Sequence, residues 1–219
     1  MKLRFGYSLD DRREIMITEH LVGRGIRDPL VIRAMREVPR EAFVPEEMTE
    51  HAYDDYPLPI GEDQTISQPY IVAYMTEALE LSATDRVLEI GTGSGYAAAV
   101  LGRIADTVYT VERLHTLART ARQRLAMLGY TNIVVLEGDG TLGWPEHAPY
   151  DAIVVTAGAP EVPKPLQEQL AVGGRLVIPV GPTLYLQMLV RVRRVTEDRY
   201  HHEELCAVRF VPLIGTAGW

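Results

Sequence analysis

The sequence predicts an α/β fold with a doubly wound, mostly parallel sheet. Between Arg86 and Gly181, five short apolar runs alternate with segments of helical spacing. Such alternation indicates right-handed βαβ units, in which helices cover both faces of a parallel sheet. The first run ends in a cluster of glycines, and the alternation stops after Gly181. We therefore expect a ligand site at the carboxyl ends of the strands, helices before the sheet, and antiparallel strands after it.

Periodicity and helix breakers place the individual elements. Helices are expected over 9–23, 28–38, 70–81, 95–105, 114–129 and 162–174, and strands over 86–90, 107–112, 132–138, 150–158 and 175–181. Asp28 is a candidate cap for the second helix, with Pro29 at its first position. After Gly181 we expect two or three longer strands with a turn near 196–199.

Length and composition fit one domain. The chain has 219 residues, of which 47% are hydrophobic and 24% are charged. Within this single domain, 1–219, we distinguish a helical cover with a long loop (1–81), a βαβ core (82–181) and a C-terminal β extension (182–219).

Charge and cysteine content narrow the function classes. The formal net charge of −8 argues against a nucleic-acid partner, because phosphate binding normally needs a basic face. No apolar run approaches the roughly 20 residues that span a bilayer, and the N-terminal segment lacks the pattern of a signal peptide. Cys206 is the only cysteine, so no internal disulfide can form. We expect a cytoplasmic protein, most simply a monomer, that binds neither nucleic acid nor membrane.

Metal binding is not expected either. The six histidines include the pair His201 and His202, but no carboxylate or cysteine partner lies at ligand spacing. A solvated strand or turn accounts for this pair.

The glycine cluster predicts a nucleotide site. Gly91, Gly93 and Gly95 alternate at a strand-to-helix junction, where glycine lets the backbone turn sharply and approach a ligand. From Gly93 to Ala98 the chain also satisfies the dinucleotide pattern G-x-G-x-x-A, which alone is a weak signal. Glu89 stands before the glycines and completes E-x-G-x-G-x-G. This arrangement resembles the Rossmann-like S-adenosylmethionine-dependent methyltransferases.

Two further strand ends carry acidic residues. Glu112 ends the second strand, where a carboxylate can accept both ribose hydroxyls. An acid there suits an NAD enzyme equally well, so Glu112 indicates a ribose and not one particular cofactor. Asp139 and Gly140 follow the third strand, and an Asp-Gly pair is also a common turn signal. In a methyltransferase they would flank the adenine, with Asp139 accepting from its exocyclic amine.

The polar stretch GEDQTISQPY, 61–70, has two interpretations. It ends a segment rich in proline, acid and aromatic residues, from Pro39 to Pro69, that is too long for a plain connector. Ser67 precedes a helix start, and serine is a leading N-cap residue. Local rules therefore favour a capping serine, whereas the length of the segment favours a functional loop.

Segments spread over nearly the whole chain resemble the protein-L-isoaspartate O-methyltransferase family. They are PREAFVP (39–45), AYDDYPLPIG (52–61), QTISQPYIVAYMTE (64–77), VLEIGTGSGYAAAVL (87–101), GDG (138–140), GWPEHAPYDAIVVTAGAP (143–160), LVIPVG (176–181) and RFVPLIG (209–215). The glycine motif is shared by many methyltransferases, whereas QTISQPY and FVPL are specific to this family. The chain departs from the family pattern at Glu62 and Asp63, where a glycine often precedes the glutamine, and at Ala97, where glutamine is frequent.

The resemblance implies a reaction. Members of the family transfer a methyl group from S-adenosylmethionine to the free α-carboxylate of an isoaspartyl residue in a damaged protein. The ester then closes to a succinimide, which partly reopens to aspartate. Isoaspartyl proteins and peptides would be the partners, and no metal is needed.

The resemblance also implies the site. Ser67 would be the catalytic hydroxyl on a strap that closes over the cofactor, while the segment from Val211 to Leu213 either lines the peptide groove or is an ordinary terminal strand. The expected cofactor-binding residues are Gln64, Thr65, Ile66, Ser67, Glu89, Gly91, Thr92, Gly93, Gly95, Glu112, Asp139 and Gly140, and the expected substrate-binding residues are Ser67, Val211, Pro212 and Leu213.

The chemistry of such a substrate agrees with the residues present. An α-carboxylate has a pKa near ~3.5 and is ionised at neutral pH, so no strong general base is required. The enzyme must align the carboxylate with the methyl group and exclude water. A neutral hydroxyl can hold one carboxylate oxygen and leave the other free to attack.

Two other functions stay open on the sequence. The chain could be a methyltransferase for a small molecule or RNA, or an NAD-binding oxidoreductase or sensor. A ligand that binds only the folded state raises the melting temperature, so NAD(H) and S-adenosylhomocysteine distinguish the last alternative from the others.

Overall fold

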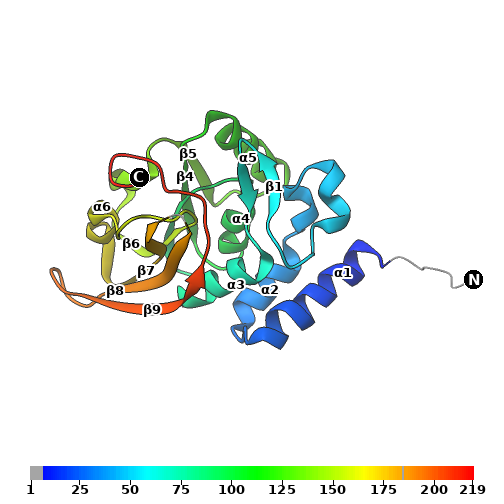
Figure 1. The fold of residues 1–219 in the computed structure, drawn as a ribbon, viewed down its shortest axis with the longest axis horizontal. Coiled ribbons are helices and arrows are strands. Elements are labelled where there is room, and N and C mark those ends of the chain that lie inside the picture. The colour runs from blue at the N-terminus through cyan, green and yellow to red at the C-terminus, as the bar shows by residue number, and fades with distance from the viewer. Residues whose placement is uncertain (1–6, 184) are drawn as a thin grey trace, which may run out of the picture.

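Among the described residues, 7–183 and 185–219, the computed structural model arranges seven strands in one central sheet of order β5-β4-β3-β6-β7-β8-β9 (Figure 1). Strands β3 to β7 are parallel, and β8 and β9 extend the sheet in antiparallel pairing. The strands are β3 (Arg86–Ile90), β4 (Thr107–Glu112), β5 (Ile133–Glu137), β6 (Tyr150–Val155), β7 (Leu170–Thr183), β8 (Leu186–Arg194) and β9 (Tyr200–Val208). The predicted fold class is confirmed.

The strand order reverses at β3. This strand pairs with β4 on one side and with β6 on the other, so that Ile90 is paired with both Val111 and Val155. In open parallel sheets, ligands bind beyond the carboxyl ends of the strands at such a reversal. The topology therefore places a site beyond Ile90.

Helices cover both faces of the sheet, with α1 and α2 at one end of the molecule and the β8–β9 ribbon extending from the other (Figure 1). The α-helices are α1 (Leu9–Ile15), α2 (Pro29–Glu37), α3 (Pro69–Ala78), α4 (Tyr96–Gly102), α5 (His115–Met127) and α6 (Lys164–Glu168). Helix α1 continues as a π-helical stretch, Met16–Leu21, and a 3-10 turn, Val22–Arg24. Asp28 caps α2 as expected, since its Oδ1 accepts the Leu30 N–H at 2.7 Å.

The core has two parts, one on each face of the sheet. Val87 belongs to the part formed with the N-terminal helices, α3 and α4, whereas Leu88 and Ile90 belong to the part beneath α6 and the C-terminal segment. Successive strand residues point to opposite faces, so a strand covered on both sides is apolar throughout. For this reason, continuous apolar runs in the sequence predict the central strands closely.

The long segment before α3 is more regular than the sequence predicted. Short 3-10 helices, Arg40–Phe43 and Glu46–His51, precede an antiparallel hairpin of β1 (Leu58–Gly61) and β2 (Gln64–Ile66). Glu62 and Asp63 form its turn with φ of 52° and 55°, in the left-handed region that two-residue hairpins require. We call residues 52–67 the strap.

The end of one helix differs clearly from the prediction. The helix expected over 162–174 ends at Glu168, because the chain from Leu170 onward pairs with β6. A Cβ at Gly174 would approach main-chain oxygens of three residues within 2.8–3.1 Å, so glycine allows the chain to enter the sheet here. The expected turn is present, closed by a bond from the Val195 N–H to the Arg199 carbonyl.

Further along, the segment 209–219 forms no named strand. It has one isolated bridge, between Gly158 and Pro212, and Phe210 is hydrogen-bonded to Gln187 of β8. The terminal-strand alternative for Val211 to Leu213 is therefore wrong. Among the described residues, no helix combines the length and apolar character needed to cross a membrane.

Candidate active site

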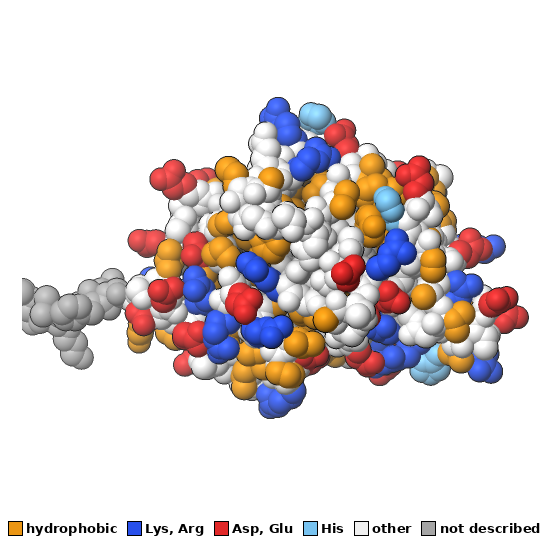
Figure 2. Space-filling model, turned by 180° about the vertical axis from the view of Figure 1, so that it is seen from behind, with side chains coloured by type: hydrophobic (Ala, Val, Ile, Leu, Met, Phe, Trp, Pro, Cys, Tyr) orange, Lys and Arg blue, Asp and Glu red, His pale blue; other side chains and the backbone are white. Residues whose placement is uncertain are grey.

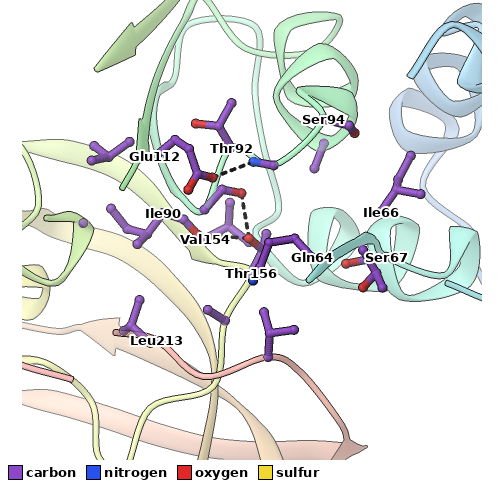
Figure 3. A pocket seen from close by; sticks show the side chains of 18 of the residues that line it. Gln64, Ile66, Ser67, Ile90, Thr92, Ser94, Glu112, Val154, Thr156 and Leu213 are labelled. Carbon is purple, nitrogen blue, oxygen red and sulfur yellow. Dashed lines mark hydrogen bonds between the residues drawn. The ribbon is translucent and has the colours of Figure 1, made fainter. Parts of the chain in front are cut away.

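A cavity lies at the carboxyl edge of the sheet, where the strand order reverses. Its walls come from the loop after β3, the ends of β4 and β6, the strap and the C-terminal segment. Ser67 and Gln64 on the strap lie across the cavity from Glu112 and Leu213 (Figure 3). The cavity thus joins parts of the chain that are distant in sequence.

The glycine loop has the shape that its sequence predicts. Gly91 has φ 95°, and a Cβ on it would meet the hydroxyl oxygen of Thr156 at 2.4 Å. That hydroxyl donates to the Gly91 carbonyl at 2.8 Å (Figure 3). Gly93 has φ 54° and lines the cavity. Both positions need glycine, which leaves the backbone open to a ligand.

Glu112 lies at the end of β4 and lines the cavity. Its Oε2 accepts the N–H of Gly93 at 2.9 Å, and its Oε1 accepts the N–H of Leu114 at 3.0 Å. Each carboxylate oxygen retains a free lone pair. The side chain therefore ties the glycine loop to β4 and can still accept two hydroxyl groups.

Glu89 lies beneath the loop and does not reach the cavity wall. It is fully buried, and its Oε2 accepts from the Thr110 hydroxyl at 2.5 Å. The hydroxyls of Thr110 and Thr92 are hydrogen-bonded at 2.6 Å, and Thr92 lines the cavity. Oε1 has no partner among the described residues. Burial raises the pKa of Glu89 to about 8, with a smaller contribution from the charge of Glu112.

Gly95 also lies outside the cavity wall. It begins α4 with φ 90°, and a Cβ on it would contact Ala121 and Leu125 at 3.5 Å. Glycine is needed here for the backbone angle, whereas a Cβ would fit in ordinary contact between α4 and α5. Its relation to the site is indirect.

Asp139 does not line the cavity, although its neighbour Gly140 does. Its Oδ1 accepts the N–H and hydroxyl of Thr141 at 2.9 and 2.6 Å, and its Oδ2 accepts the Thr216 N–H at 2.8 Å. Burial opposes ionisation, yet the bonds from Thr141 and Thr216 hold the pKa of the Asp139 carboxyl below its usual value. Both oxygens are engaged in fixing the C-terminal segment, so only Gly140 faces the space expected for adenine.

The strap residues Gln64 to Ser67 all line the cavity, as expected, but Ser67 is not the helix cap. Gln68 occupies the N-cap position of α3 without a side-chain capping bond. Instead Asp55 accepts the N–H of Tyr70 at 3.3 Å and the Nε2 of Gln68 at 2.9 Å. The Ser67 hydroxyl makes no hydrogen bond with any described residue. The N–H of Tyr70 in the first turn of α3 is bonded by Asp55 instead, fifteen positions earlier in the chain.

A second hollow leads outward from Ser67. Tyr185 and residues 207–212 form one of its sides, and Thr65 and Gln68 lie on the strap side. Ser67, Thr65, Thr156, Val211 and Pro212 line both hollows. Leu213 lines the inner cavity only, held by its N–H bond to the Gly158 carbonyl at 2.8 Å. An extended chain can therefore reach Ser67 from outside.

Other wall residues were not anticipated from the sequence. They include Met75, Thr76, Ile90, Ser94, Tyr96, Arg113, Leu114, Val154, Thr156 and Ile214. Thr156 directly follows β6, so the rule that ligands gather at strand ends would have found it. Ser94 lies within the glycine loop itself. Tyr96 carries no such signal, because only tertiary packing brings its ring to the wall.

The geometry fits a cofactor that carries a ribose. The glycine loop leaves no side chain in the way, and Glu112 can accept a ribose diol. Among the described residues, no cluster of His, Cys, Asp or Glu could hold a metal ion. With the sheet topology, the glycine loop and Glu112 define a Rossmann-like nucleotide-binding site, as the predicted methyltransferase class requires.

Comparison with known proteins specifies the family. Residues 11–218 match the family model described as protein-L-isoaspartate(D-aspartate) O-methyltransferase. A curated relative from Geotalea uraniireducens (strain Rf4), protein-L-isoaspartate O-methyltransferase 1, is 77% identical over 219 residues, which cover 100% of both chains. Another, from Pelobacter propionicus, is 76% identical over 208 residues, 95% of this chain and 92% of the relative. This chain belongs to the protein-L-isoaspartate O-methyltransferase family.

Solved structures agree with the sequence matches. A protein-L-isoaspartate O-methyltransferase superposes with a TM-score of 0.84 at 32% identity, over 94% of this chain and 67% of the other. A Plasmodium falciparum protein, solved in complex with S-adenosyl-L-homocysteine, gives a TM-score of 0.80 at 26% identity, over 93% and 98% of the two chains. Together the matches decide the cofactor in favour of S-adenosylmethionine and against NAD.

Proposed function

We propose that this chain repairs damaged proteins by transferring a methyl group from S-adenosylmethionine to the free α-carboxylate of L-isoaspartyl residues, with Ser67 as the catalytic hydroxyl. The observation that carries the proposal is the position of Ser67. Its hydroxyl makes no bond within the described chain and stands where the cofactor cavity meets the outer hollow. A substrate carboxylate that enters through the outer hollow can reach this hydroxyl.

The glycine loop and Glu112 would hold the cofactor. Backbone groups of Gly91 to Gly93 would contact its amino-acid part, and Glu112 would accept the ribose hydroxyls. Gly140 would flank the adenine. Three residues outside the cavity wall support it indirectly: Glu89 through Thr110 and Thr92, Gly95 by starting α4, and Asp139 by binding the C-terminal segment. When bound, S-adenosylmethionine supplies an electrophilic methyl group, whose bonding electrons return to sulfur on transfer.

Ser67 aligns the nucleophile and does not activate it. The substrate carboxylate is ionised at neutral pH, so no proton has to leave it before attack. The serine hydroxyl donates to one carboxylate oxygen and directs the other oxygen toward the methyl group. Gln64 to Ile66 on the strap cover the cavity and exclude water.

The substrate peptide lies in the outer hollow. Val211 and Pro212 line it together with Tyr185 and the strap. The Val211 carbonyl accepts the Gly158 N–H and the Leu213 N–H donates to the Gly158 carbonyl, each at 2.8 Å, so this segment is fixed as one wall of the hollow.

The partners are proteins and peptides rather than nucleic acids or membranes. Over the described residues visible from behind, acidic and basic side chains are interspersed without a broad area of one sign (Figure 2). Nucleic-acid binding normally uses a continuous basic face. We further propose a monomer that works in the cytoplasm, which light scattering after size-exclusion chromatography and fractionation of cells would test.

The decisive experiment compares two peptides. Labelled methyl groups from S-adenosylmethionine should enter an isoaspartyl peptide and not the matching aspartyl peptide. Equal labelling of both, or of neither, contradicts the proposed function. If a small molecule or RNA were the true substrate, substitutions in the strap would leave activity on that substrate intact.

A further inference from the structure

Arg40 is a fully buried arginine beside the active site, and the proposed function assigns it no part. Its side chain is 0% exposed, whereas arginine is almost never fully buried unless it is paired. No carboxylate within the described ranges 7–183 and 185–219 lies at ion-pair distance from its guanidinium. Asp55 interacts with it electrostatically, but from beyond that distance. Burial of such a charge is costly, so its retention calls for a reason.

The guanidinium joins the two ends of the strap. Its Nε donates to the carbonyl of Ala52 at 2.7 Å, and its Nη2 donates to the carbonyl of Ser67 at 2.7 Å. These residues are the first and last of the strap. A planar, rigid fork of donors is the geometry that can hold two acceptors in a constant relation.

The guanidinium also rests on the wall of the cofactor cavity. Its central carbon lies 4.7 Å from the centre of the Tyr96 ring, and Tyr96 lines the cavity. Phe43, from the same 3-10 turn as Arg40, meets this ring edge-on at 5.6 Å. Nη1 has no hydrogen-bond partner among the described residues. Arg40 is thus held against the cavity wall on one side and the strap on the other.

The hydrogen bond from Arg40 to the Ser67 carbonyl affects the position of the Ser67 hydroxyl. The hydroxyl has no hydrogen bond of its own among the described residues, so its position depends on the backbone that carries it. The carbonyl held by Arg40 belongs to Ser67 itself, one bond from the Cα that bears the side chain. Fixing the carbonyl also fixes the adjacent Cα of Ser67. The hydroxyl can then occupy only the few places that the staggered rotamers give it.

We propose, as an extension of the proposed function, that Arg40 is a positioning residue for methyl transfer: by clamping the carbonyls of Ala52 and Ser67 it holds the Ser67 hydroxyl at the junction of the cofactor cavity and the peptide hollow. Arg40 does not touch the substrate. Its effect on the reaction passes through Ser67, and its loss leaves the cofactor site in place.

The test uses two variants of Arg40 and a matched control. Arg40→Lys keeps the charge but loses the planar fork, and Arg40→Met keeps the length but loses charge and donors. Arg175→Met is the control, because Arg175 also donates to main-chain carbonyls, those of Leu79 at 2.5 Å and Glu80 at 2.6 Å, and is absent from both hollows.

If Arg40 positions Ser67, the Arg40 variants should lose turnover while their affinity for the cofactor stays nearly the same. Both Arg40 variants should lose ~10- to 100-fold in kcat on an isoaspartyl peptide, since displacement of a reacting group by about 1 Å costs on the order of 100-fold. Their Kd for S-adenosylhomocysteine should change less than about 3-fold. Arg175→Met should lower the melting temperature and leave kcat unchanged. Equal losses of kcat in all three variants, or wild-type kcat in Arg40→Lys and Arg40→Met, overturn the proposal.

A double-mutant cycle with Ser67→Ala tests the route of the effect. If Arg40 acts through Ser67, Arg40→Lys causes no further loss of kcat in the Ser67→Ala background. Additive losses mean that Arg40 acts elsewhere and overturn the proposal. The cycle is distinct from the test of function, because a wild-type enzyme that labels no isoaspartyl peptide contradicts the proposed function before any variant is made.

A measurement on the wild-type protein covers the case in which the Arg40 variants do not fold. In protein labelled with ¹⁵N-arginine, a clamped guanidinium rotates slowly and shows separate Hη signals with cross-peaks to the Tyr96 ring. A single averaged Hη signal at this position overturns the clamp. This readout does not depend on catalytic activity.

Discussion

The carboxylate of Asp55 accepts the backbone N–H of Tyr70 at 3.3 Å, across fifteen positions of the chain. The same carboxylate pairs with Arg24 at 2.6 Å and accepts from Gln68 at 2.9 Å. It therefore satisfies a partly buried N–H group in the first turn of α3 and fastens the strap to that helix. Ser67, which local rules make the cap, is left with a free hydroxyl.

Removal of the Asp55 carboxylate should loosen the strap. We expect Asp55→Ala to lower the free energy of unfolding by ~1–2 kcal/mol, since it removes a helix-terminal acceptor and a partner of Arg24. The KM for an isoaspartyl peptide should rise as well. Asp54→Ala is the control, because among the described residues the Asp54 carboxylate is hydrogen-bonded only to its near neighbours His51 and Tyr56. Denaturation midpoints that do not differ between the two variants would count against this role.

Loss of the Ser67 hydroxyl should affect turnover and not stability. We expect Ser67→Ala to reduce kcat by ~10- to 100-fold, since alignment of the carboxylate is lost. Its melting temperature should stay near that of the wild type, because the hydroxyl makes no capping bond. Calorimetry and single-turnover kinetics measure the two effects separately. A marked fall in melting temperature with unchanged kcat would restore the capping interpretation.

Glu112 should control the affinity for the cofactor. In Glu112→Gln, one side-chain oxygen becomes an NH₂ group that faces the N–H of Gly93 or Leu114 and can no longer accept a ribose hydroxyl. A hydrogen bond to a charged group is worth about 1.5–3 kcal/mol, so the Kd for S-adenosylhomocysteine should rise by ~10- to 100-fold. Titration calorimetry measures this.

The matched control is Glu137→Gln. Glu137 is paired with Glu112 in the register of β4 and β5 but bonds to His115 at the surface. Its substitution should leave the Kd unchanged. Equal Kd values for the two variants would show that Glu112 does not bind the ribose.

Glu89 should make stability depend on pH. Its folded-state pKa of about 8 exceeds the ordinary value of 4.5, so the folded protein binds the proton more tightly than the unfolded chain. The resulting stability is fully present below the unfolded pKa and is lost as the pH rises through the folded pKa. Each unit of pKa difference corresponds to about 1.4 kcal/mol.

Glu89→Gln cannot ionise and provides the comparison. Between about pH 5 and about pH 9, the wild type should lose more stability than Glu89→Gln. Urea midpoints measured across this range check the prediction. Parallel curves for the two proteins would mean that Glu89 is not the group responsible.

Local patterns predicted most of the central sheet. The strand from Arg86 to Ile90 has the bounds expected from its apolar run, because a strand buried on both faces must be apolar along its whole length. Helix α6 was overextended to Gly174, because the helical pattern does not show that Leu170 pairs with β6. Pairing between distant segments overrides local preference.

Part of the cavity wall could also be predicted from the sequence. Gly91, Gly93 and Glu112 line the cavity as expected, since the position of a strand end is a local property and parallel strands end at one edge. Asp139 was placed on the wall by the same rule, but its carboxylate turns to Thr141 and Thr216. The C-terminal segment that it binds is remote in sequence, and no local pattern indicates this contact.

The sequence by itself determined the parallel sheet, the glycine loop and the family, because each depends on residue types within short segments. Tertiary structure alone decided which bonds surround Ser67. Asp55 takes over the first turn of α3, and Arg40 holds the Ser67 carbonyl from 27 positions away. The physical reason is that a hydrogen-bond donor or acceptor is satisfied by whichever partner the fold brings nearest. The spacing of residues along the sequence does not show which partner that is.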